Sequence, residues 1–189
     1  DSVSKSFNEF AKGPKIPNYP VIDQKRNCIY VSDSFGFNEK GVGIYKFDLT
    51  SGKGGPCSEE LFNFANGMCL SPNSDYLYVV ESFHPCISRL PINSDGTFGK
   101  KEIFTEDIAT VPDGLAFDKE DNLFISCYEP SRIYISDSKG STRLLIEDEH
   151  CTTLAHPTNI SISEDGKTMY TANLGRWHIT EIDISSLYN

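Results

Sequence analysis

One unit of strand, turn and strand recurs four times along the chain, and this repetition constrains the fold more than any other feature. Each copy carries an asparagine or aspartate at the same position, and these anchor residues are Asn18, Asn66, Asp113 and Asn159. The intervals between them are 48, 47 and 46 residues. One blade of a propeller takes roughly 40–50 residues. The period therefore predicts a radial array of similar units.

The second copy shows how each unit is built. A short apolar run at 68–70 is followed by a turn cluster at 71–75 and by a β-branched and aromatic run at 77–80. Third strands are expected at 43–49, 86–92, 132–138 and 178–184, and fourth strands at 59–65, 100–106 and 142–148. No long segment has the apolar spacing of an amphipathic helix. The sequence therefore predicts an all-β fold, a β-propeller of four-stranded antiparallel blades around a central channel.

The ends of the array leave two arrangements open. The expected units span about 14–65, 66–107, 108–150 and 151–189, which makes about four blades. The last unit lacks a fourth strand, whereas the segment at 5–18 aligns with 100–113 as a fourth strand leading into an anchor. Either residues 1–189 form a single propeller domain whose leading strand closes a ring of four, or they form the C-terminal part of a larger ring. Both arrangements protect the sheet edges.

Composition limits the partners. Aromatic residues make up 12% and hydrophobic residues 38% of the chain, which is enough for a packed core. The net charge of −10 argues against nucleic acid, whose phosphates need clustered lysine and arginine, and it is compatible with a cation site. No run of 18 apolar residues predicts a membrane span. The chain starts without a methionine or a signal-peptide core, so we expect that an upstream portion was removed or left out.

The cysteines show no spacing that is typical of a metal site. The six are Cys28, Cys57, Cys69, Cys86, Cys127 and Cys151. None forms C-x-x-C, and no cysteine and histidine cluster has zinc-finger spacing. We interpret all six as reduced, which favours a cytoplasmic location.

The anchors predict a cation site on the channel axis. Each stands at the start of the innermost strand of its unit, so radial repetition directs four oxygen-bearing side chains toward one channel. Calcium and magnesium prefer carboxylate and amide oxygens as ligands. The alternative is that the pairs at 66–67 and 113–114 are ordinary Asn-Gly and Asp-Gly turns. The recurrence of one residue class at one phase of the repeat favours the site.

Further residues are expected at the same rim of the propeller. Asp33, Glu81 and Asn173 end the second strands, where they would either support the metal shell or cap turns. The glycine-containing loop at 34–43 would form either a lid over the channel or an inert hairpin loop. No G-x-S-x-G motif occurs, which argues against a Ser-His-Asp hydrolase.

These segments resemble a known family. The stretches ANGMCLSPNSDYLYVVES, VPDGLAFDKEDNLFIS and HPTNISISEDGKTMYTANLG are similar to successive blade motifs of the SMP-30/gluconolactonase/luciferin-regenerating enzyme (LRE) family, and PNYPVIDQKRNCIYVSDS is similar to the preceding blade. The resemblance runs from about residue 17 to residue 175 and keeps the order of the motifs. It implies a six-bladed propeller with lactone-hydrolase activity. It also implies one divalent cation in the channel (Ca²⁺, Zn²⁺, Mg²⁺ or Mn²⁺), of which we favour Ca²⁺.

The resemblance also implies roles for three anchors. In that family the asparagine of the (P/A)-N-G motif and the aspartate of P-D-G are metal ligands, and they match Asn66 and Asp113. Asn18 matches an asparagine that lies near the substrate. Asp113 would also act as the catalytic general base, although a nearby ion keeps a carboxylate ionised and so weakens it as a base. A glutamate ligand near the family's N-terminus has no counterpart in this chain.

The prediction from the sequence is a divalent-metal-dependent, gluconolactonase-like hydrolase of lactones or related small esters. Tyr19-Pro20 after Asn18 replaces the Asp-Gly of many family members, which puts sugar-lactone specificity in doubt. The alternatives are a non-catalytic propeller that binds calcium or a protein through its rim loops, and a strictosidine-synthase-like condensing enzyme. The last has no catalytic glutamate in a matching position. We expect a small-molecule substrate and neither a nucleic acid nor a membrane partner, and self-association stays open.

Overall fold

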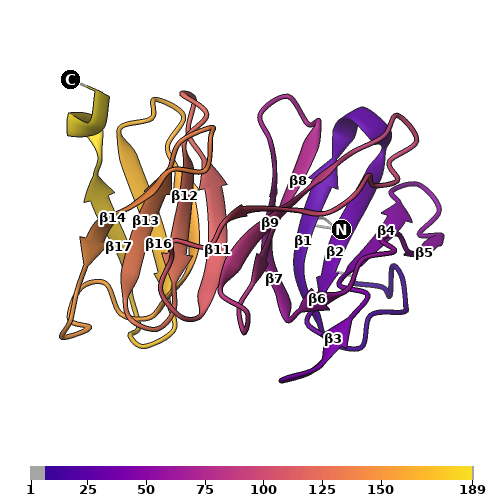
Figure 1. Ribbon diagram of the computed structural model, residues 1–189, viewed down its shortest axis with the longest axis horizontal. Coiled ribbons are helices and arrows are strands. Elements are labelled where there is room, and N and C mark those ends of the chain that lie inside the picture. Colours follow the sequence, from indigo (N-terminus) through magenta and orange to yellow (C-terminus); the bar gives the residue numbers. More distant parts are fainter. Residues whose placement is uncertain (1–6, 189) are drawn as a thin grey trace.

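The computed structural model describes residues 7–188, which form four antiparallel blades that stand side by side (Figure 1). Blade 1 contains β1 (Pro17–Asp23), β2 (Cys28–Asp33), β4 (Ile44–Asp48) and β5 (Gly54–Pro56). Blade 2 contains β7 (Ala65–Leu70), β8 (Tyr76–Glu81), β9 (Cys86–Pro91) and β10 (Glu102–Thr105). Blade 3 contains β11 (Pro112–Phe117), β12 (Leu123–Cys127), β13 (Arg132–Ser136) and β14 (Thr142–Glu147). Blade 4 contains β15 (Pro157–Ile162), β16 (Thr168–Asn173) and β17 (Ile179–Asp183).

The remaining elements are short. Strands β3 (Lys40–Gly41) and β6 (Phe62–Asn63) pair with each other, and two 3₁₀ helices, η1 (Gln24–Arg26) and η2 (Ser185–Tyr188), follow β1 and β17. The predicted all-β propeller with about four blades is confirmed. Over residues 7–188, no helix has the length and apolar character needed to cross a membrane.

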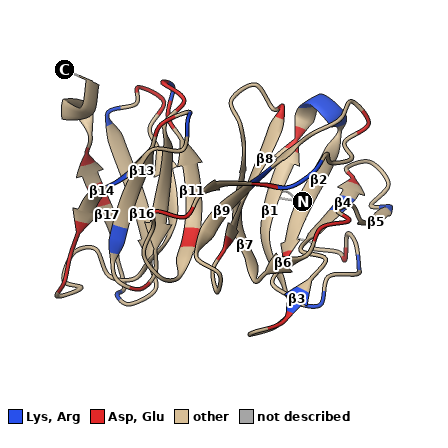
Figure 2. Cartoon of the chain, viewed as in Figure 1, with Lys and Arg blue, Asp and Glu red and all other residues tan. Residues whose placement is uncertain are grey.

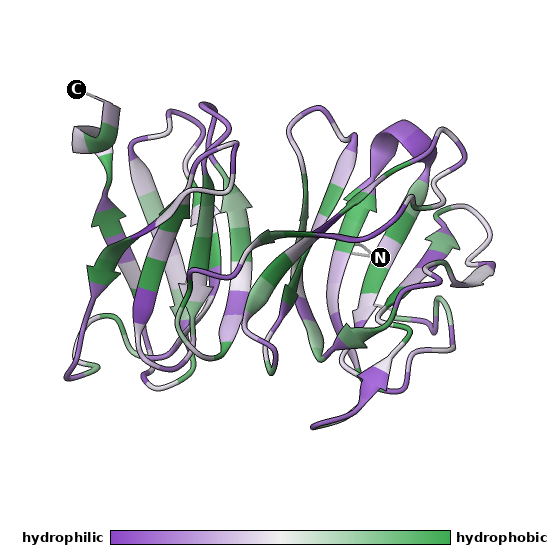
Figure 3. Ribbon diagram, viewed as in Figure 1, coloured by the Kyte–Doolittle hydropathy of each residue, from purple (hydrophilic) through white to green (hydrophobic). Residues whose placement is uncertain are grey.

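The innermost strands lie next to one another in chain order. Strand β1 lies against β7, β7 against β11, and β11 against β15. Strands β8 and β12 have a blade on each side, and their successive side chains are buried alternately in two different cores. Hydrophobic residues recur along the strands of the blades (Figure 3). Charged residues lie mainly in turns and at strand ends (Figure 2).

Three apolar cores fill the spaces between neighbouring blades. The core between blades 1 and 2 contains Tyr30, Met68 and Leu77, the next contains Val80, Leu115 and Ile125, and the last contains Phe124, Ile133 and Met169. Each of these side chains is at most 3% exposed. Burying a side chain of this size contributes about 1.5–3 kcal/mol. Packing between blades therefore fixes how the innermost strands meet.

The predicted fourth strand of the first unit, residues 59–65, is wrong. The outer strand of blade 1 is β5, whose Pro56 pairs with Tyr45 of β4. An edge strand needs only backbone groups on one side, so a Gly-Gly-Pro stretch can supply it despite its low strand propensity. The apolar Phe62 is buried in the first core instead, where β6 pairs with β3.

The leading segment was expected to form a strand at 5–18, of which residues 5 and 6 lie outside the described range. Residues 7–16 form no strand. They lie over blade 1, where Gly13 contacts the ring of Tyr45 and the carbonyl of Phe10 lies against Gly52. The carbonyl of Phe104 in β10 lies against Gly140 of blade 3 in the same way. The segment therefore takes the place of an outer strand beside blade 1, and blade 4 keeps three strands within the described residues.

Candidate metal centre at the channel mouth

All four anchors lie near the first residue of an innermost strand, at one end of the blades that we call the mouth. Each of these strands has a register shift at its anchor. In β11, for example, Pro112 pairs with Cys127 and Leu115 with Ile125, so β11 has one more residue between these two pairs than β12 has. The same shift occurs in β1, β7 and β15. Such bulges re-aim side chains and are frequent beside active sites. The anchors therefore belong to bulged strands and not to turns.

Glycines after two anchors let the innermost strands approach closely. A Cβ on Gly67 would overlap the carbonyl oxygen of Asp113, and one on Gly114 would lie 2.7 Å from the Cα of Asn159. Real Cβ atoms do not make such contacts with backbone, so only glycine fits at these positions. The Asn-Gly and Asp-Gly pairs thus bring the anchors of blades 2, 3 and 4 together.

A serine hydroxyl connects Asn66 to the next blade. The amide Nδ2 of Asn66 donates to Ser82 Oγ (3.1 Å), and Ser82 Oγ donates to the carbonyl of Pro112 (2.7 Å). Pro112 directly precedes Asp113. Asn66 is 6% exposed, and its Oδ1 makes no hydrogen bond with the described residues.

Blade 1 repeats this connection. Asn18 Nδ2 donates to Ser34 Oγ (3.0 Å), which donates to the carbonyl of Ala65 (2.9 Å), the residue before Asn66. The two serines join the anchors of blades 1, 2 and 3 in one hydrogen-bonded series. In blade 3 Tyr128 follows the second strand in place of a serine, and the series ends at Asp113.

Asp113 is a partly buried carboxylate without a partner. No hydrogen bond or ion pair from residues 7–188 reaches its side chain, and burial raises the pKa of Asp113 to about 7. A desolvated carboxylate of this kind is favourable only when a positive charge lies beside it. The structure thus leaves the oxygens of Asn18, Asn66 and Asp113 free at the mouth.

Asn159 differs from the other anchors because its oxygen is engaged. Its Oδ1 accepts hydrogen bonds from Tyr19 Oη (3.2 Å) and from the backbone amide of Ile160 (2.8 Å). Tyr19 follows Asn18 in blade 1, so this bond joins the first and last blades. Both residues line a cavity that continues over the free face of blade 4.

The polar residues that end the second strands of blades 1, 2 and 4 hold the chain where it enters these blades. Asp33 accepts from the backbone amides of Lys15 (2.9 Å) and Ile16 (2.7 Å), and Asn173 accepts from that of Ala155 (3.0 Å). Of the two interpretations of these residues, the capping role fits their contacts.

Glu81 has the same role and is almost fully buried. It accepts from Asn63 N (2.8 Å) and Ser88 Oγ (2.6 Å) and forms an ion pair with Lys101 (3.0 Å). Burial by itself would raise the pKa of Glu81, but the hydrogen bonds and the Lys101 ammonium outweigh it, so this pKa is lowered. Glu81 therefore has its own cation and contrasts with Asp113.

Three phenylalanines form an apolar rim beside Asn66. Phe64 lies two residues before this anchor, and its ring contacts those of Phe83 (4.7 Å between centroids) and Phe37 (5.2 Å). Phe37 is 69% exposed and belongs to the loop at 34–43, which β3 and β6 hold in place. The loop that was expected to be either a lid or an inert hairpin thus supplies one wall of the mouth.

The backbone is left-handed just before three of the anchors. Phe64, Val111 and His156 have φ angles of 59°, 57° and 53°. Such angles are uncommon for bulky side chains and an outlier for a β-branched one, and they tend to cluster at functional sites. Backbone strain therefore recurs two or three residues before the anchors of blades 2, 3 and 4.

Sequence reasoning missed Ser34 and Ser82. A signal was present, because each serine lies 16 residues after an asparagine anchor. The pairing of β1 with β2 and of β7 with β8 converts this spacing into contact.

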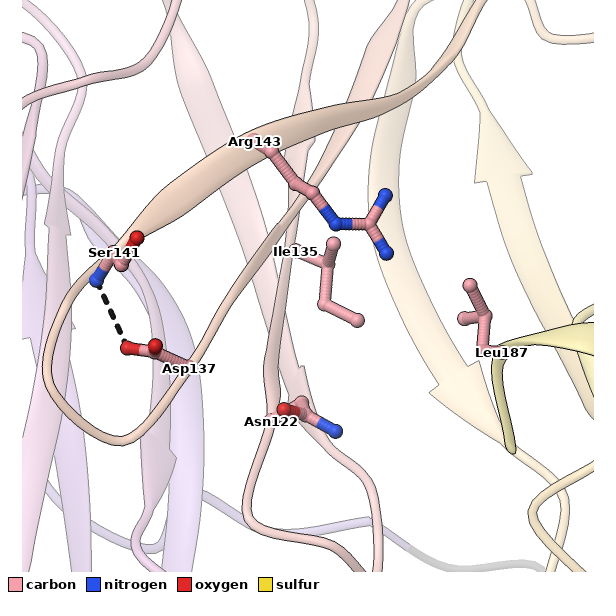
Figure 4. Close-up of a pocket in the computed structure, with 6 residues that line it drawn as sticks. All are labelled: Asn122, Ile135, Asp137, Ser141, Arg143 and Leu187. Atoms are coloured by element: carbon pink, nitrogen blue, oxygen red, sulfur yellow. Dashed lines mark hydrogen bonds between the residues drawn. The ribbon is translucent and has the colours of Figure 1, made fainter. Parts of the chain in front are cut away.

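The opposite end of blade 3 carries an unrelated pocket. It is lined by Asn122, Ile135, Asp137, Ser141, Arg143 and Leu187 (Figure 4). The backbone amide of Ser141 donates to Asp137 Oδ1 (3.0 Å), which closes the turn at the pocket's edge. No anchor reaches this pocket.

The described part of the chain contains no group of three or more histidine, cysteine, aspartate and glutamate side chains that could hold a metal ion. All six cysteines are free. A metal at the mouth would therefore bind one carboxylate together with amide oxygens, a donor set that suits a hard cation such as calcium.

Comparison with known proteins gives consistent results. Residues 35–170 match the sequence model of the SMP-30/Gluconolactonase/LRE-like region. The chain is 26% identical over 151 residues to a lactonase, drp35, of Staphylococcus haemolyticus, covering 69% of this chain and 46% of that protein. It is 34% identical over 116 residues to a gluconolactonase of Zymomonas mobilis, covering 56% of this chain and 31% of that protein.

A solved structure shares the fold. The gluconolactonase XC5397 of Xanthomonas campestris superposes with a TM-score of 0.67 at 17% identity, over 83% of this chain and 54% of that one. The chain thus spans less than half the length of the two sequence relatives and about half of the structural one.

Proposed function

Because the chain belongs to the SMP-30/gluconolactonase/LRE-like family, we propose that it is a divalent-metal-dependent hydrolase of lactones or related small esters. The observation that carries this proposal is Asp113, a partly buried carboxylate without a protein partner beside an asparagine with a free oxygen. The lactonase and gluconolactonase relatives support the same reaction class.

The residues at the mouth fit a cation. Asn66 and Asp113 would hold it, because their oxygens are free and the backbones of β7 and β11 meet between them. We favour Ca²⁺ on the basis of this all-oxygen donor set. When bound, a divalent ion supplies positive charge that polarises a lactone carbonyl and favours loss of a proton from water.

The chain's own groups would orient the substrate and accept a proton. The Oδ1 of Asn18 faces away from Ser34 and can accept a hydrogen bond from the substrate or from water. A carboxylate oxygen of Asp113 can accept a proton from an attacking water as general base. A bound cation lowers the basicity of this carboxylate, so binding the ion is its first role.

The apolar rim indicates a substrate with an apolar part. Phe37 and Phe83 are 69% and 42% exposed, and they lie beside the residues that would hold the reacting group. Apolar area that a substrate removes from water contributes about 25 cal/mol per Å². A lactone that carries an alkyl or aromatic substituent would gain this contribution, which a sugar lactone would not.

Metal titration and ester hydrolysis together test the proposal. Calorimetry with Ca²⁺, Mg²⁺, Mn²⁺ and Zn²⁺ should show one site in the wild type and none in Asp113→Asn. The matched control is Glu164→Gln, which removes an exposed carboxylate from a turn at the far end of blade 4.

A pH-indicator assay of lactone opening should show activity that EDTA removes and added metal restores. Metal binding without opening of any sugar, alkyl or aromatic lactone would instead support a non-catalytic calcium-binding propeller.

A further inference from the structure

We propose that Ser82 and Ser34 are positioning residues, which fix the direction of the side-chain amides of Asn66 and Asn18 and so present their oxygens to the mouth. Part of this inference rests on the proposed function, since the Asn66 oxygen is a candidate metal ligand and the Asn18 oxygen is a candidate substrate contact. The amide directions themselves can be tested without a metal.

The direction of each hydroxyl carries the argument. A serine hydroxyl has one proton, and Ser82 donates it to the carbonyl of Pro112 (2.7 Å). Towards Asn66 the hydroxyl can then only accept, so the amide must present its Nδ2 (3.1 Å). The opposite face of the amide, Oδ1, must therefore point away from Ser82.

A reversed amide would break the arrangement. With Oδ1 against Ser82, the hydroxyl could donate to Asn66 or to Pro112 but not to both. One buried acceptor would then lack a donor, and Ser82 itself is only 1% exposed. Ser34 is fully buried and donates to the carbonyl of Ala65 (2.9 Å), so the same argument applies to Asn18.

Each serine also links one anchor to the next. Ser34 joins the amide of Asn18 to the residue before Asn66, and Ser82 joins the amide of Asn66 to the residue before Asp113. A single hydroxyl thus sets both the amide direction and the relative position of two neighbouring anchors.

Two other serines in the same sheets, Ser126 and Ser32, form hydrogen bonds with backbone groups only. Ser126 accepts from the amide of Gly114 (2.9 Å), and Ser32 accepts from that of Tyr19 (2.9 Å). These bonds satisfy amides in the bulges of β11 and β1, and neither touches an anchor side chain. Backbone support is therefore provided separately from the contacts of Ser34 and Ser82.

Metal affinity of Ser82 variants tests the inference. Groups that orient metal ligands typically change affinity by 10–100-fold when removed, so Ser82→Ala should bind Ca²⁺ or Tb³⁺ about 10–100-fold more weakly than the wild type. Ser82→Thr keeps the hydroxyl and should restore affinity to within about threefold. The control Ser136→Ala removes an equally buried serine at the opposite end of blade 3 and should leave affinity unchanged. Urea unfolding checks that all variants fold.

Equal metal affinity of the wild type and Ser82→Ala would overturn the inference. Nuclear magnetic resonance gives an independent readout in metal-free wild-type protein, because the side-chain NH₂ protons of Asn66 should show a nuclear Overhauser effect to the β protons of Ser82. If this effect is absent, the amide faces the other way and the inference fails. If it is present but no divalent ion binds, the positioning role stands and the proposed function fails.

Discussion

Replacing Asp113 by asparagine tests the central feature of the mouth, a desolvated carboxylate without a protein partner. Burial raises the pKa of Asp113 from an ordinary value of 3.8 to about 7. Because each pKa unit corresponds to about 1.36 kcal/mol, ionising this group would destabilise the metal-free folded state by about 4 kcal/mol. The side chain keeps some contact with solvent, so we expect a measured effect of about 2–4 kcal/mol.

The sign of the pH dependence follows from the direction of this shift. Between about pH 4 and pH 7 the folded state holds a proton that the unfolded state has released. The free energy of unfolding therefore decreases as the pH rises through this window and levels off above it. Asparagine carries no charge, so the metal-free Asp113→Asn variant should be more stable than the wild type at pH 8 and similar to it near pH 4.

Urea unfolding followed by circular dichroism, in EDTA at pH 4.5 and pH 8, measures the difference. Glu164→Gln serves as the control and should show no pH-dependent change. Calcium at 100 times its dissociation constant should stabilise the wild type by about 2.7 kcal/mol, without a matching effect on the variant. A wild-type minus variant difference that is the same at both pH values would refute the reasoning, because the carboxylate would then be normally solvated.

Three other substitutions test neighbouring features. Gly67→Ala places a Cβ against the backbone of β11 and should lower the free energy of unfolding, measured by urea titration, by about 1–3 kcal/mol or more. The control is Gly55→Ala, whose added Cβ would meet no heavy atom within 4 Å, and it should change the free energy of unfolding by less than about 0.5 kcal/mol. Glu81→Gln leaves a mostly buried lysine without its carboxylate and should destabilise by about 3–5 kcal/mol at pH 7. The pKa of Glu81 lies below its ordinary value of 4.5, so the ionised side chain stabilises the fold above pH 4.5, and this stabilisation is lost as the pH falls through the lowered pKa. The difference in free energy of unfolding between the wild type and Glu81→Gln should therefore become smaller in acid. Phe37→Ser removes an exposed ring and should lower kcat/KM about threefold to tenfold for alkyl-substituted lactones but not for unsubstituted ones, and an equal effect on both would contradict the rim's role.

The central part of the fold could be predicted because it depends on local periodicity. The predicted third strand at 86–92 corresponds to β9 (Cys86–Pro91) and that at 132–138 to β13 (Arg132–Ser136), since alternating apolar residues must face the cores on each side. The outer strands could not be predicted equally well. Strand β5 is a Gly-Gly-Pro stretch, and only its backbone pairing with β4 makes it a strand.

The candidate site was predictable in position but not in mechanism. The repeat predicted that Asn18, Asn66 and Asp113 lie at one end of neighbouring strands, and in the structure they do, whereas their metal-binding and substrate-binding roles stay predictions. The directions of the Asn18 and Asn66 side-chain amides involve serine hydroxyls that are close only after β1 pairs with β2 and β7 with β8. Such contacts join residues 16 positions apart, and composition or periodicity does not reveal them.

Three features of the mouth each lower the stability of the folded state. The bulges interrupt strand pairing, Phe64 and Val111 adopt left-handed backbone conformations, and Asp113 is desolvated without a partner. A channel with a purely structural role would be more stable with a neutral side chain at position 113, as Asn66 and Asn18 occupy the corresponding positions without this penalty. Glu81 shows that the fold can provide a lysine for a buried carboxylate in the neighbouring blade. The absence of such a partner for Asp113 among residues 7–188 therefore supports the proposal that a cation from solution binds at the mouth.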